Sequence, residues 1–296
     1  MLLKDKNIVI TGAGRGIGKN FAIAFAKEGA NLGLISRTLE ELEQTKKEIE
    51  EISLNGKVII KSTDITKYED VAEAFELFNE KLGLLNGVIA NAGASRMGST
   101  HEFDNDRFSN IVNVNILGVY HTFKACYPYL KKDDKKSKAR FLITGSAAFP
   151  NAMPKFAAYT ATKYATVGLQ RSMALEYKKE NITFNQILPT MVDTRLSRGR
   201  KTGDGNKPDS VMNPWDLNDY YLFFMSDLSN RVNDKLIYTT DFQEIKTIIS
   251  EAPSDKTESW DDFKDYLMEK TPKIYENVKK LGKLVDFVIT QSKESI

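Results

Sequence analysis

Apolar residues follow two alternating patterns along the chain. Short runs that are apolar throughout are typical of buried strands, and they occupy residues 7–11, 31–36, 57–62, 87–90, 139–144 and 183–188. Between them, apolar residues recur every three or four positions, which predicts helices over residues 19–27, 38–55, 67–81, 111–130 and 159–180. Apolar strands that alternate with helices predict a parallel sheet covered on both faces. We therefore expect an α/β fold built on a doubly wound parallel sheet.

The last part of the chain departs from this alternation. Residues 260–268 and 274–289 carry helical patterns that are interrupted by prolines. Their apolar stripes have to be buried against another surface. We expect residues 1–242 to form a single domain. Residues 243–296 would form a helical extension, packed on that domain beside its binding cleft or placed at a subunit contact.

Composition excludes several classes of function. The chain has 296 residues, 41% of them hydrophobic and 28% charged, as in ordinary globular proteins. A net charge of +2 argues against nucleic-acid binding. The single cysteine, Cys126, and two histidines leave no disulfide within the chain and no expected metal site. The charged N-terminus does not resemble a signal peptide, and no apolar run reaches the roughly 20 residues of a membrane span, so we expect a cytoplasmic protein.

A glycine-rich segment, TGAGRGIG at residues 11–18, lies between the first predicted strand and the first predicted helix. Glycines allow a sharp turn and a close approach to a pyrophosphate, and the helix N-terminus adds free N–H groups and a positive dipole end. A plain loop is the alternative for a lone glycine cluster. The strand–turn–helix context favours a Rossmann-type nucleotide-binding site.

The end of the second strand bears on which cofactor binds. Many NAD-binding folds place an acidic residue there for the ribose 2′-hydroxyl. Here the chain reads Ser36-Arg37-Thr38, without an acid. Arg37, with Arg15 from the glycine-rich segment, can instead pair with a 2′-phosphate, which favours NADP over NAD. The alternative is two solvated surface arginines.

A further group of polar residues suggests acid–base chemistry. Tyr159 and Lys163 are four residues apart, so they share one face of a helix, and Ser146 follows the end of the fifth strand. A nearby ammonium lowers the pKa of a phenol, which would make Tyr159 a proton donor and acceptor. Alone, the pair is weak evidence, since an aromatic ring often packs on a lysine stem. Other candidates follow strand ends in the same way, at Asp64, Asn91 and Pro189.

Together these motifs resemble the short-chain dehydrogenase/reductase family over roughly residues 5–242. The matching segments are residues 11–18, Asp64, residues 91–93, Asn115, Ser146 and the YTATK segment at residues 159–163. The resemblance implies that Tyr159 is the catalytic acid/base and that Ser146 positions the carbonyl. It implies that Lys163 holds the nicotinamide ribose and lowers the pKa of Tyr159, and that Asn115 holds a water in the proton relay.

The resemblance also implies a set of cofactor contacts. They are Gly12, Gly14, Arg15, Gly16, Ile17, Gly18, Ser36, Arg37, Thr38, Asp64, Ile65, Asn91, Ala92, Gly93, Tyr159, Lys163, Pro189, Val192 and Thr194. Two structural alternatives stay open. Asn115 can be a buried amide with satisfied hydrogen bonds, and Asn91 can belong to a structural turn at the strand end.

Three segments differ from the family pattern or vary within it. Thr190 stands where the family has glycine after proline, and a β-branched residue avoids positive φ, so the turn there is expected to differ. Residues 236–238 form a degraded last strand. Residues 195–213 correspond to the substrate lid, whose arginines and lysines would favour an anionic substrate, with a solvated loop as the alternative.

The sequence thus predicts an NADP(H)-dependent oxidoreductase that transfers a hydride between nicotinamide and a ketone or secondary alcohol, as a carbonyl reductase of a small molecule. Phe149, Met153 and Phe156 are candidates for an apolar part of the pocket, with core packing as the alternative. The rival hypothesis is an NADP-binding regulatory or scaffold protein with the same fold and little turnover. By the resemblance, the helices at residues 111–130 and 159–180 would pair chains into a homodimer or homotetramer.

Overall fold

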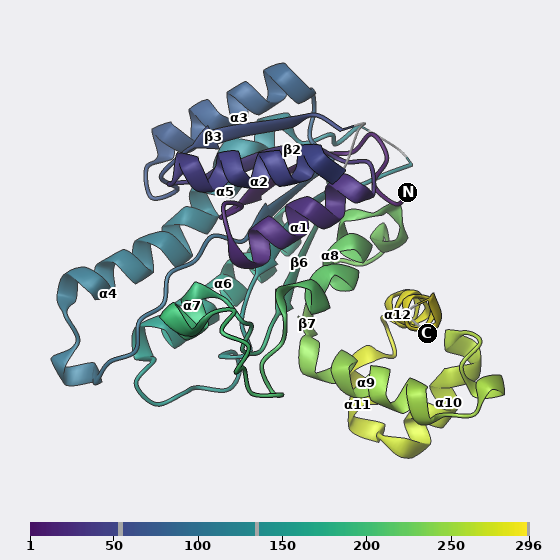
Figure 1. The fold of residues 1–296 in the computed structure, drawn as a ribbon. Coiled ribbons are helices and arrows are strands. Elements are labelled where there is room, and N and C mark those ends of the chain that lie inside the picture. Colours follow the sequence, from purple (N-terminus) through teal and green to yellow (C-terminus); the bar gives the residue numbers. More distant parts are fainter. Residues whose placement is uncertain (53–55, 134–135, 295–296) are drawn as a thin grey trace.

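The protein is built on one parallel sheet (Figure 1). The computed structural model describes residues 1–52, 56–133 and 136–294. The sheet has seven strands in the order β3-β2-β1-β4-β5-β6-β7, and every pair is parallel. The strands are β1 (Asn7–Thr11), β2 (Asn31–Ser36), β3 (Val58–Ser62), β4 (Gly87–Ala90), β5 (Ala139–Thr144), β6 (Ile182–Leu188) and β7 (Lys235–Tyr238). The predicted fold class is confirmed, including the short last strand.

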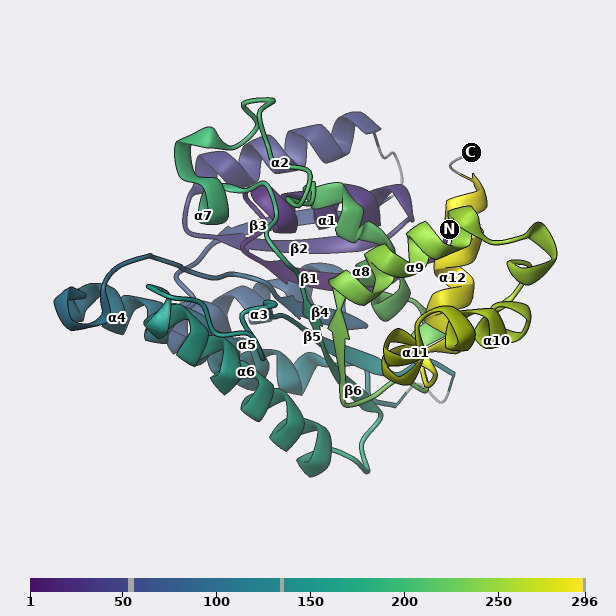
Figure 2. The same cartoon turned by 90° about the horizontal axis from the view of Figure 1, so that it is seen from below.

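Helices cover both faces of the sheet (Figures 1 and 2). They are α1 (Gly16–Lys27), α2 (Leu39–Ile52), α3 (Tyr68–Leu82), α4 (Asn105–Val112), α5 (Gly118–Cys126), α6 (Ala157–Glu176), α7 (Arg195–Arg198), α8 (Asn218–Met225), α9 (Thr239–Glu251), α10 (Trp260–Lys270), α11 (Pro272–Val278) and α12 (Gly282–Glu294). Side chains of β1 alternate between two cores. Ile8 and Ile10 join the core under α1, α2 and α8, and Val9 joins the one under α3, α5 and α6. This two-sided burial explains why the strands are apolar throughout.

Two predicted helices are broken in the structure. The expected helix at residues 111–130 is α4, a π-helical turn at Asn113–Leu117, and then α5. It begins earlier than predicted because the Asp104 carboxylate caps it, accepting a 2.9 Å hydrogen bond from the Arg107 N–H. The expected helix at residues 274–289 is likewise divided into α11 and α12. Of the helix expected at residues 38–55, residues 53–55 lie outside the described ones.

The C-terminal helices pack on the sheet domain as a group (Figure 1). The expected boundary after residue 242 falls inside α9, whose Phe242 is buried in the main core. Helix α12 packs against α8 and against the 3₁₀ turn Asp227–Ser229, and the Phe287 ring centroid lies 6.1 Å from that of Phe223. Helix α9 begins beside β6, where the Thr239 hydroxyl donates to the Leu188 carbonyl. The extension therefore buries its apolar stripes within the same chain.

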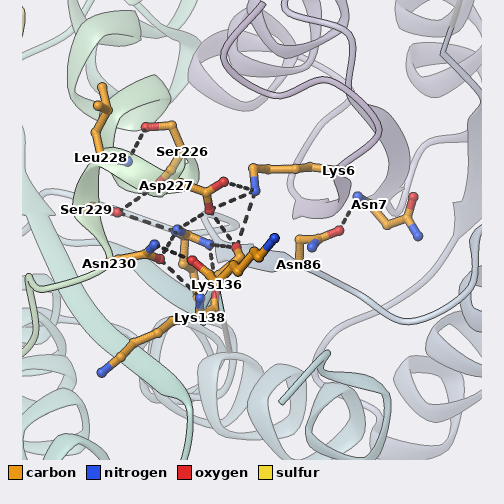
Figure 3. Close-up of polar contacts among 12 residues, drawn as sticks. Lys6, Asn7, Asn86, Lys136, Lys138, Ser226, Asp227, Leu228, Ser229 and Asn230 are labelled. Atoms are coloured by element: carbon orange, nitrogen blue, oxygen red, sulfur yellow. Dashed lines mark hydrogen bonds and ion pairs between the residues drawn. The ribbon is translucent and has the colours of Figure 1, made fainter. Parts of the chain in front are cut away.

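A partly buried ionic cluster ties the turn after α8 to the amino ends of β1 and β5 (Figure 3). The Asp227 carboxylate lies 2.9 Å from the Lys6 amine and 3.1 Å from the Arg140 guanidinium, which is 2% exposed. Ser137 is the third residue bound to this carboxylate, and its hydroxyl donates a 2.6 Å hydrogen bond. Desolvation alone would raise the pKa of Asp227, but the bonds from Ser137 and Lys6 and the nearby positive charges lower it. One carboxylate therefore serves two largely buried cations.

We predict that Asp227→Asn destabilises the protein. Losing one partner of a buried ion pair costs about 3–5 kcal/mol, and we expect about 2 kcal/mol here because the Asp227 side chain is 53% exposed. A carboxyl group whose pKa is lowered on folding contributes stability above its unfolded pKa of about 4, and this contribution is lost as the pH falls through the folded pKa. Urea unfolding at pH 7 and in acid tests both effects.

The matched control is Asp255→Asn. Asp255 forms an exposed surface pair with Lys256 at 3.7 Å, so its loss is expected to change the free energy of unfolding by less than about 0.5 kcal/mol. Equal stabilities of the two variants at pH 7 would contradict the role given to the cluster.

Candidate active site

The glycine-rich turn is held against the end of the neighbouring strand β4. The Thr11 hydroxyl accepts hydrogen bonds of 3.0 Å from the N–H groups of Asn91 and Ala92. The Asn91 side chain donates in return to the Thr11 carbonyl at 2.9 Å. Gly12 has φ of +70°, and a Cβ there would lie 2.9 Å from the Ala92 Cα. Asn91 therefore builds the turn, as the structural alternative for this residue expects.

The amino end of α1 fits an anion. Arg15 is its N-cap residue and makes no side-chain capping bond, and the first turn carries no acidic residue. The first N–H groups of a helix need partners from outside the helix, and here the chain supplies no capping side chain. Helix α1 also lies close to the turn, since a Cβ on Gly18 would meet the Gly12 carbonyl oxygen at 2.3 Å. The residues present fit the pyrophosphate of a dinucleotide.

A carboxylate that sequence reasoning missed stands near the end of β2. Glu41, in the first turn of α2, forms an ion pair with Arg15, in which its Oε1 lies 2.9 Å from the guanidinium. A Cβ built on Gly14 would lie 2.9 Å from both the Ser36 hydroxyl and the Glu41 Cβ, so these two side chains flank the turn together. The fold thus adds a carboxylate to the cations of this region, which weakens the argument for NADP that rests on residues 36–38 alone. Residues 36–38 contain no acidic side chain, but Glu41 of α2, five positions after Ser36, supplies a carboxylate.

Other residues expected near the adenosine have varied surroundings. Arg37 is exposed, and its guanidinium makes no hydrogen bond or ion pair with the residues described. Desolvation would raise the pKa of Asp64, but hydrogen bonds from Thr66 and the charges of Arg37 and Lys67 lower it. Ile65 is buried and packs on α5, where a Cβ on Gly118 would meet its Cδ1 at 2.4 Å. The Ser36 hydroxyl is bonded to the Thr38 backbone at both its N–H and its carbonyl.

Ser146, Tyr159 and Lys163 come together beyond the end of β5. Ser146 lies just after this strand, near enough to the Tyr159 hydroxyl to influence its pKa. Lys163, one turn after Tyr159 in α6, lies with its amine 5.4 Å from the Tyr159 ring centroid. The same amine donates a 3.0 Å hydrogen bond to the Thr144 carbonyl at the strand end. The predicted convergence of strand end and helix face is thus present.

The protonation behaviour of this group differs from expectation. Desolvation raises the pKa of Tyr159, and the hydrogen bond from Ser146 opposes that rise. Burial lowers the pKa of Lys163 from 10.5 to about 8. The expected lowering of the Tyr159 pKa by Lys163 is therefore not found in this state. The lysine amine bonds to a backbone carbonyl and loses its charge at a pH close to neutrality.

Asn115 lies in the π-helical turn and is 2% exposed. Its side-chain oxygen accepts from the Ala94 N–H at 2.7 Å, and its amide donates to the Ala94 carbonyl and the Thr162 hydroxyl, each at 2.9 Å. Thr162 in turn donates to the Tyr159 carbonyl at 2.7 Å. The side chain is thus a satisfied buried amide, which links the turn after β4 to the helix that carries Tyr159. Ala94 and Thr162 were not predicted from the sequence.

The segment after β6 runs past the glycine-rich turn. Pro189 accepts a 2.8 Å hydrogen bond from the Ala147 N–H, and Val192 pairs with Met212. Thr190 does not have the positive φ that its glycine counterpart suggested, so a β-branched residue fits without strain. Thr194 caps α7, and its Cγ2 lies 3.2 Å from where a Cβ on Gly16 would be.

Two arginines of the expected lid, residues 195–213, form ion pairs within the chain. Arg198 lies 3.0 Å from both Asp193 and Asp204. Arg195 pairs with Glu41 at 3.2 Å, and the Lys207 amine donates to the Val211 carbonyl at 2.8 Å. The side chain of Arg200 lies outside the described part. These pairs reduce the positive charge that Arg195 and Arg198 would offer to an anionic substrate.

The aromatic residues expected in the pocket divide into two groups. The Phe156 ring centroid lies 6.3 Å from that of Tyr159, in an edge-on arrangement. Phe149 packs on Tyr164 at 4.7 Å, which matches the packing alternative. Met153 is 41% exposed. Phe156 and Met153 therefore stay candidates for contact with a substrate.

A comparison with known families agrees with this site. A family model described as short chain dehydrogenase matches residues 6–204, which span the glycine-rich turn, Asn115 and the Ser146–Tyr159–Lys163 group. The chain belongs to the short-chain dehydrogenase/reductase family. This short-chain dehydrogenase/reductase is accordingly an oxidoreductase that interconverts CH–OH and C=O groups with a nicotinamide cofactor. Among its described residues, no helix is long and apolar enough to cross a membrane.

Similar proteins include a dehydrogenase and two structures that were solved with different nicotinamide cofactors. The (−)-trans-carveol dehydrogenase of Rhodococcus erythropolis is 31% identical over 207 residues, covering 66% of this chain and 73% of that protein. The 3-ketoacyl-(acyl-carrier-protein) reductase from Brucella melitensis, complexed with NADH, is 26% identical with a TM-score of 0.72, over 79% of this chain and 96% of that one. The alcohol dehydrogenase of Thermococcus sibiricus, complexed with 5-hydroxy-NADP, is 29% identical with a TM-score of 0.71, over 79% and 95%.

The lowered pKa of Lys163 predicts a pH dependence of cofactor binding. Lys163 is charged below about pH 8 and neutral above it, and only the ammonium can donate all its hydrogen bonds and attract the anionic cofactor. We predict that NADPH binding, followed by its fluorescence, weakens as the pH rises through 8, and that Lys163→Met removes this pH dependence. The control is Lys179→Met, at an exposed lysine beyond α6. A wild-type pH profile that persists in Lys163→Met would contradict the assignment.

Proposed function

We propose that this short-chain dehydrogenase/reductase is an NADP(H)-dependent carbonyl reductase, which transfers a hydride between nicotinamide and a ketone or secondary alcohol. The observation that carries the proposal is the convergence of Ser146, just after the end of β5, with Tyr159 and Lys163 of α6, where the Lys163 amine lies 5.4 Å from the Tyr159 ring centroid. The group lies on the edge of the sheet where the strands of an α/β fold end and ligands bind. A binding protein without turnover has no need for a buried acid–base group of this kind.

Ser146, Tyr159 and Lys163 would have separate roles in the proton transfer. When bound, the nicotinamide cofactor supplies or accepts a hydride at its C4. Ser146 would donate a hydrogen bond to the carbonyl oxygen, and Tyr159 would give that oxygen its proton as the carbon is reduced. Proton transfer would leave a phenolate on Tyr159. The positive charge of the Lys163 ammonium would stabilise that phenolate. Asn115 holds α6 and the π-helical turn in place, beside the route by which water would return the proton.

Arg37 and Arg15 support the choice of NADP(H). Arg37 is exposed at the end of β2 and carries no ion pair among the residues described, so it is free to meet a 2′-phosphate. Arg15 lies in the glycine-rich turn, where it is 55% exposed and paired with Glu41. The relative from Thermococcus sibiricus is complexed with an NADP derivative and the one from Brucella melitensis with NADH, so the family accommodates either cofactor.

We further propose a substrate with an apolar, uncharged body. Arg195 and Arg198 of the lid are paired within the chain, whereas Met153, Met191 and Leu196 expose 41%, 52% and 46% of their surface. Phe156 lies against Tyr159. A relative is named for carveol, an alcohol with a hydrocarbon ring. Apolar surface around one polar group is typical of small-molecule sites.

The proposed assembly is a homodimer or homotetramer in the cytoplasm, paired through the α4–α5 and α6 surfaces. Phe108, Leu117 and Tyr120 expose 42%, 41% and 45% of their surface on the first of these, and Leu175 exposes 69% on the second. Exposed apolar residues grouped in this way favour a protein contact.

Tyr159→Phe tests the proposal directly. Removal of the acid–base hydroxyl is expected to lower kcat/KM at least about 100-fold, while NADPH still binds, because general acid catalysis contributes about 10²–10⁴ in rate. The measurement is NADPH oxidation with a panel of cyclic and aliphatic ketones, with NADH in parallel.

The matched control is Tyr164→Phe, since Tyr164 lies on the same helix and its hydroxyl donates to the Pro150 carbonyl. We expect its kcat/KM to stay within about threefold of wild type, as for a hydroxyl outside the proton transfer. Equal activity of Tyr159→Phe and wild type would contradict the mechanism. Tight NADPH binding without turnover of any ketone would favour the regulatory or scaffold role.

A further inference from the structure

Glu41 joins two arginines that are far apart in the sequence. Its Oε1 lies 2.9 Å from the Arg15 guanidinium in the glycine-rich turn and 3.2 Å from that of Arg195, the first residue of α7 in the lid. The arginine side chains are 55% and 66% exposed, and Glu41 is 25% exposed. One carboxylate oxygen thus occupies the space between two accessible cations.

The position of Glu41 is fixed by packing around its helix turn. Thr45, one turn later, is fully buried, and its hydroxyl lies 3.3 Å from the carbonyls of both Ala13 and Gly14. Side chains of Ser36 and Glu41 flank Gly14 so closely that a Cβ there would lie 2.9 Å from each. Glu41 therefore stands where the end of β2 meets the glycine-rich turn, the place in which an adenosine ribose is expected.

We infer that Glu41 is a specificity-determining residue that limits the preference of this protein for NADP(H) over NAD(H). Its carboxylate takes the anion position between Arg15 and Arg195, so a 2′-phosphate has to displace it, whereas a 2′-hydroxyl does not. Two anions close together repel each other. The phosphate can form an ion pair with Arg15 only when the ion pair between Arg15 and Glu41 is broken. As long as Glu41 keeps its two ion pairs, Arg37 is the cation of this group that can attract a 2′-phosphate without competition. This inference rests on the proposed function, because it concerns the cofactor of the same site.

The lid takes part in this competition through Arg195. When a 2′-phosphate replaces Glu41, Arg195 can pair with the phosphate, so the first residue of α7 contributes to binding of NADP(H) and not of NAD(H). Removal of Glu41 and removal of Arg195 should therefore change the selectivity in opposite directions. A role of Glu41 in local stability alone predicts no such opposition.

The experiment compares dissociation constants of NADPH and NADH, measured by cofactor fluorescence without any carbonyl substrate. We expect Glu41→Gln to tighten NADPH binding about tenfold and to leave NADH within about threefold, a difference that added salt reduces. Arg195→Gln is expected to weaken NADPH about threefold and to leave NADH unchanged, as for an exposed ion pair. Glu40→Gln is the matched control, because it removes the same charge from an exposed residue in the same helix turn.

Selectivity that is the same in Glu41→Gln, Glu40→Gln and wild type would overturn the inference, as would a shift of Glu41→Gln toward NADH. Binding of neither cofactor to the wild type would overturn both this inference and the proposed function. Binding of both cofactors with no ketone turnover would contradict the reductase activity alone and leave the selectivity result to decide on Glu41. Thermal unfolding of each variant confirms that it is folded before binding is compared.

Discussion

Two strand ends joined by hydrogen bonds support the whole site. Thr11 at the end of β1 and Asn91 after β4 bond to each other through side chain and backbone, so the glycine-rich turn has one position relative to the rest of the sheet. The buried Asn115 amide extends this framework from the turn after β4 to α6, which carries Tyr159. Because all seven strands are parallel, these fixed ends lie at the same edge. These hydrogen bonds connect the glycine-rich turn to the helix that carries Tyr159.

Burial also determines the chemistry at this edge. The Lys163 amine, nearly removed from solvent and bonded to the Thr144 carbonyl, has a pKa of about 8, and the Tyr159 hydroxyl is held protonated. Tyr159 is therefore in the form that donates a proton, which suits reduction of a carbonyl. At the opposite edge, Lys6 and Arg140 share the Asp227 carboxylate. There the buried cations and their shared carboxylate stabilise the fold, because they connect the turn after α8 to the starts of β1 and β5.

Much of this arrangement could be predicted from the sequence, because apolar strand runs and the spacing of glycines and of Tyr159 and Lys163 are local properties. The sheet, its strand ends and the meeting of Ser146 with Tyr159 followed from them. What could not be predicted depends on contacts between distant residues. Glu41 reaches the cofactor region from a helix, and the lid charges find partners in the fold. The π-helical turn at Asn113–Leu117 likewise interrupts a helix whose apolar pattern continues through it.

The central claim is that the chain transfers a hydride while Tyr159 supplies the proton. The most direct test is to supply NADPH deuterated at C4 of the nicotinamide, with each ketone of an apolar panel, and to analyse the products by mass spectrometry and NMR. The account predicts an alcohol that carries one deuterium on the former carbonyl carbon, with its hydroxyl proton drawn from solvent. An alcohol formed without deuterium from either hydrogen at C4, or no alcohol from any ketone while NADPH binds tightly, would contradict it.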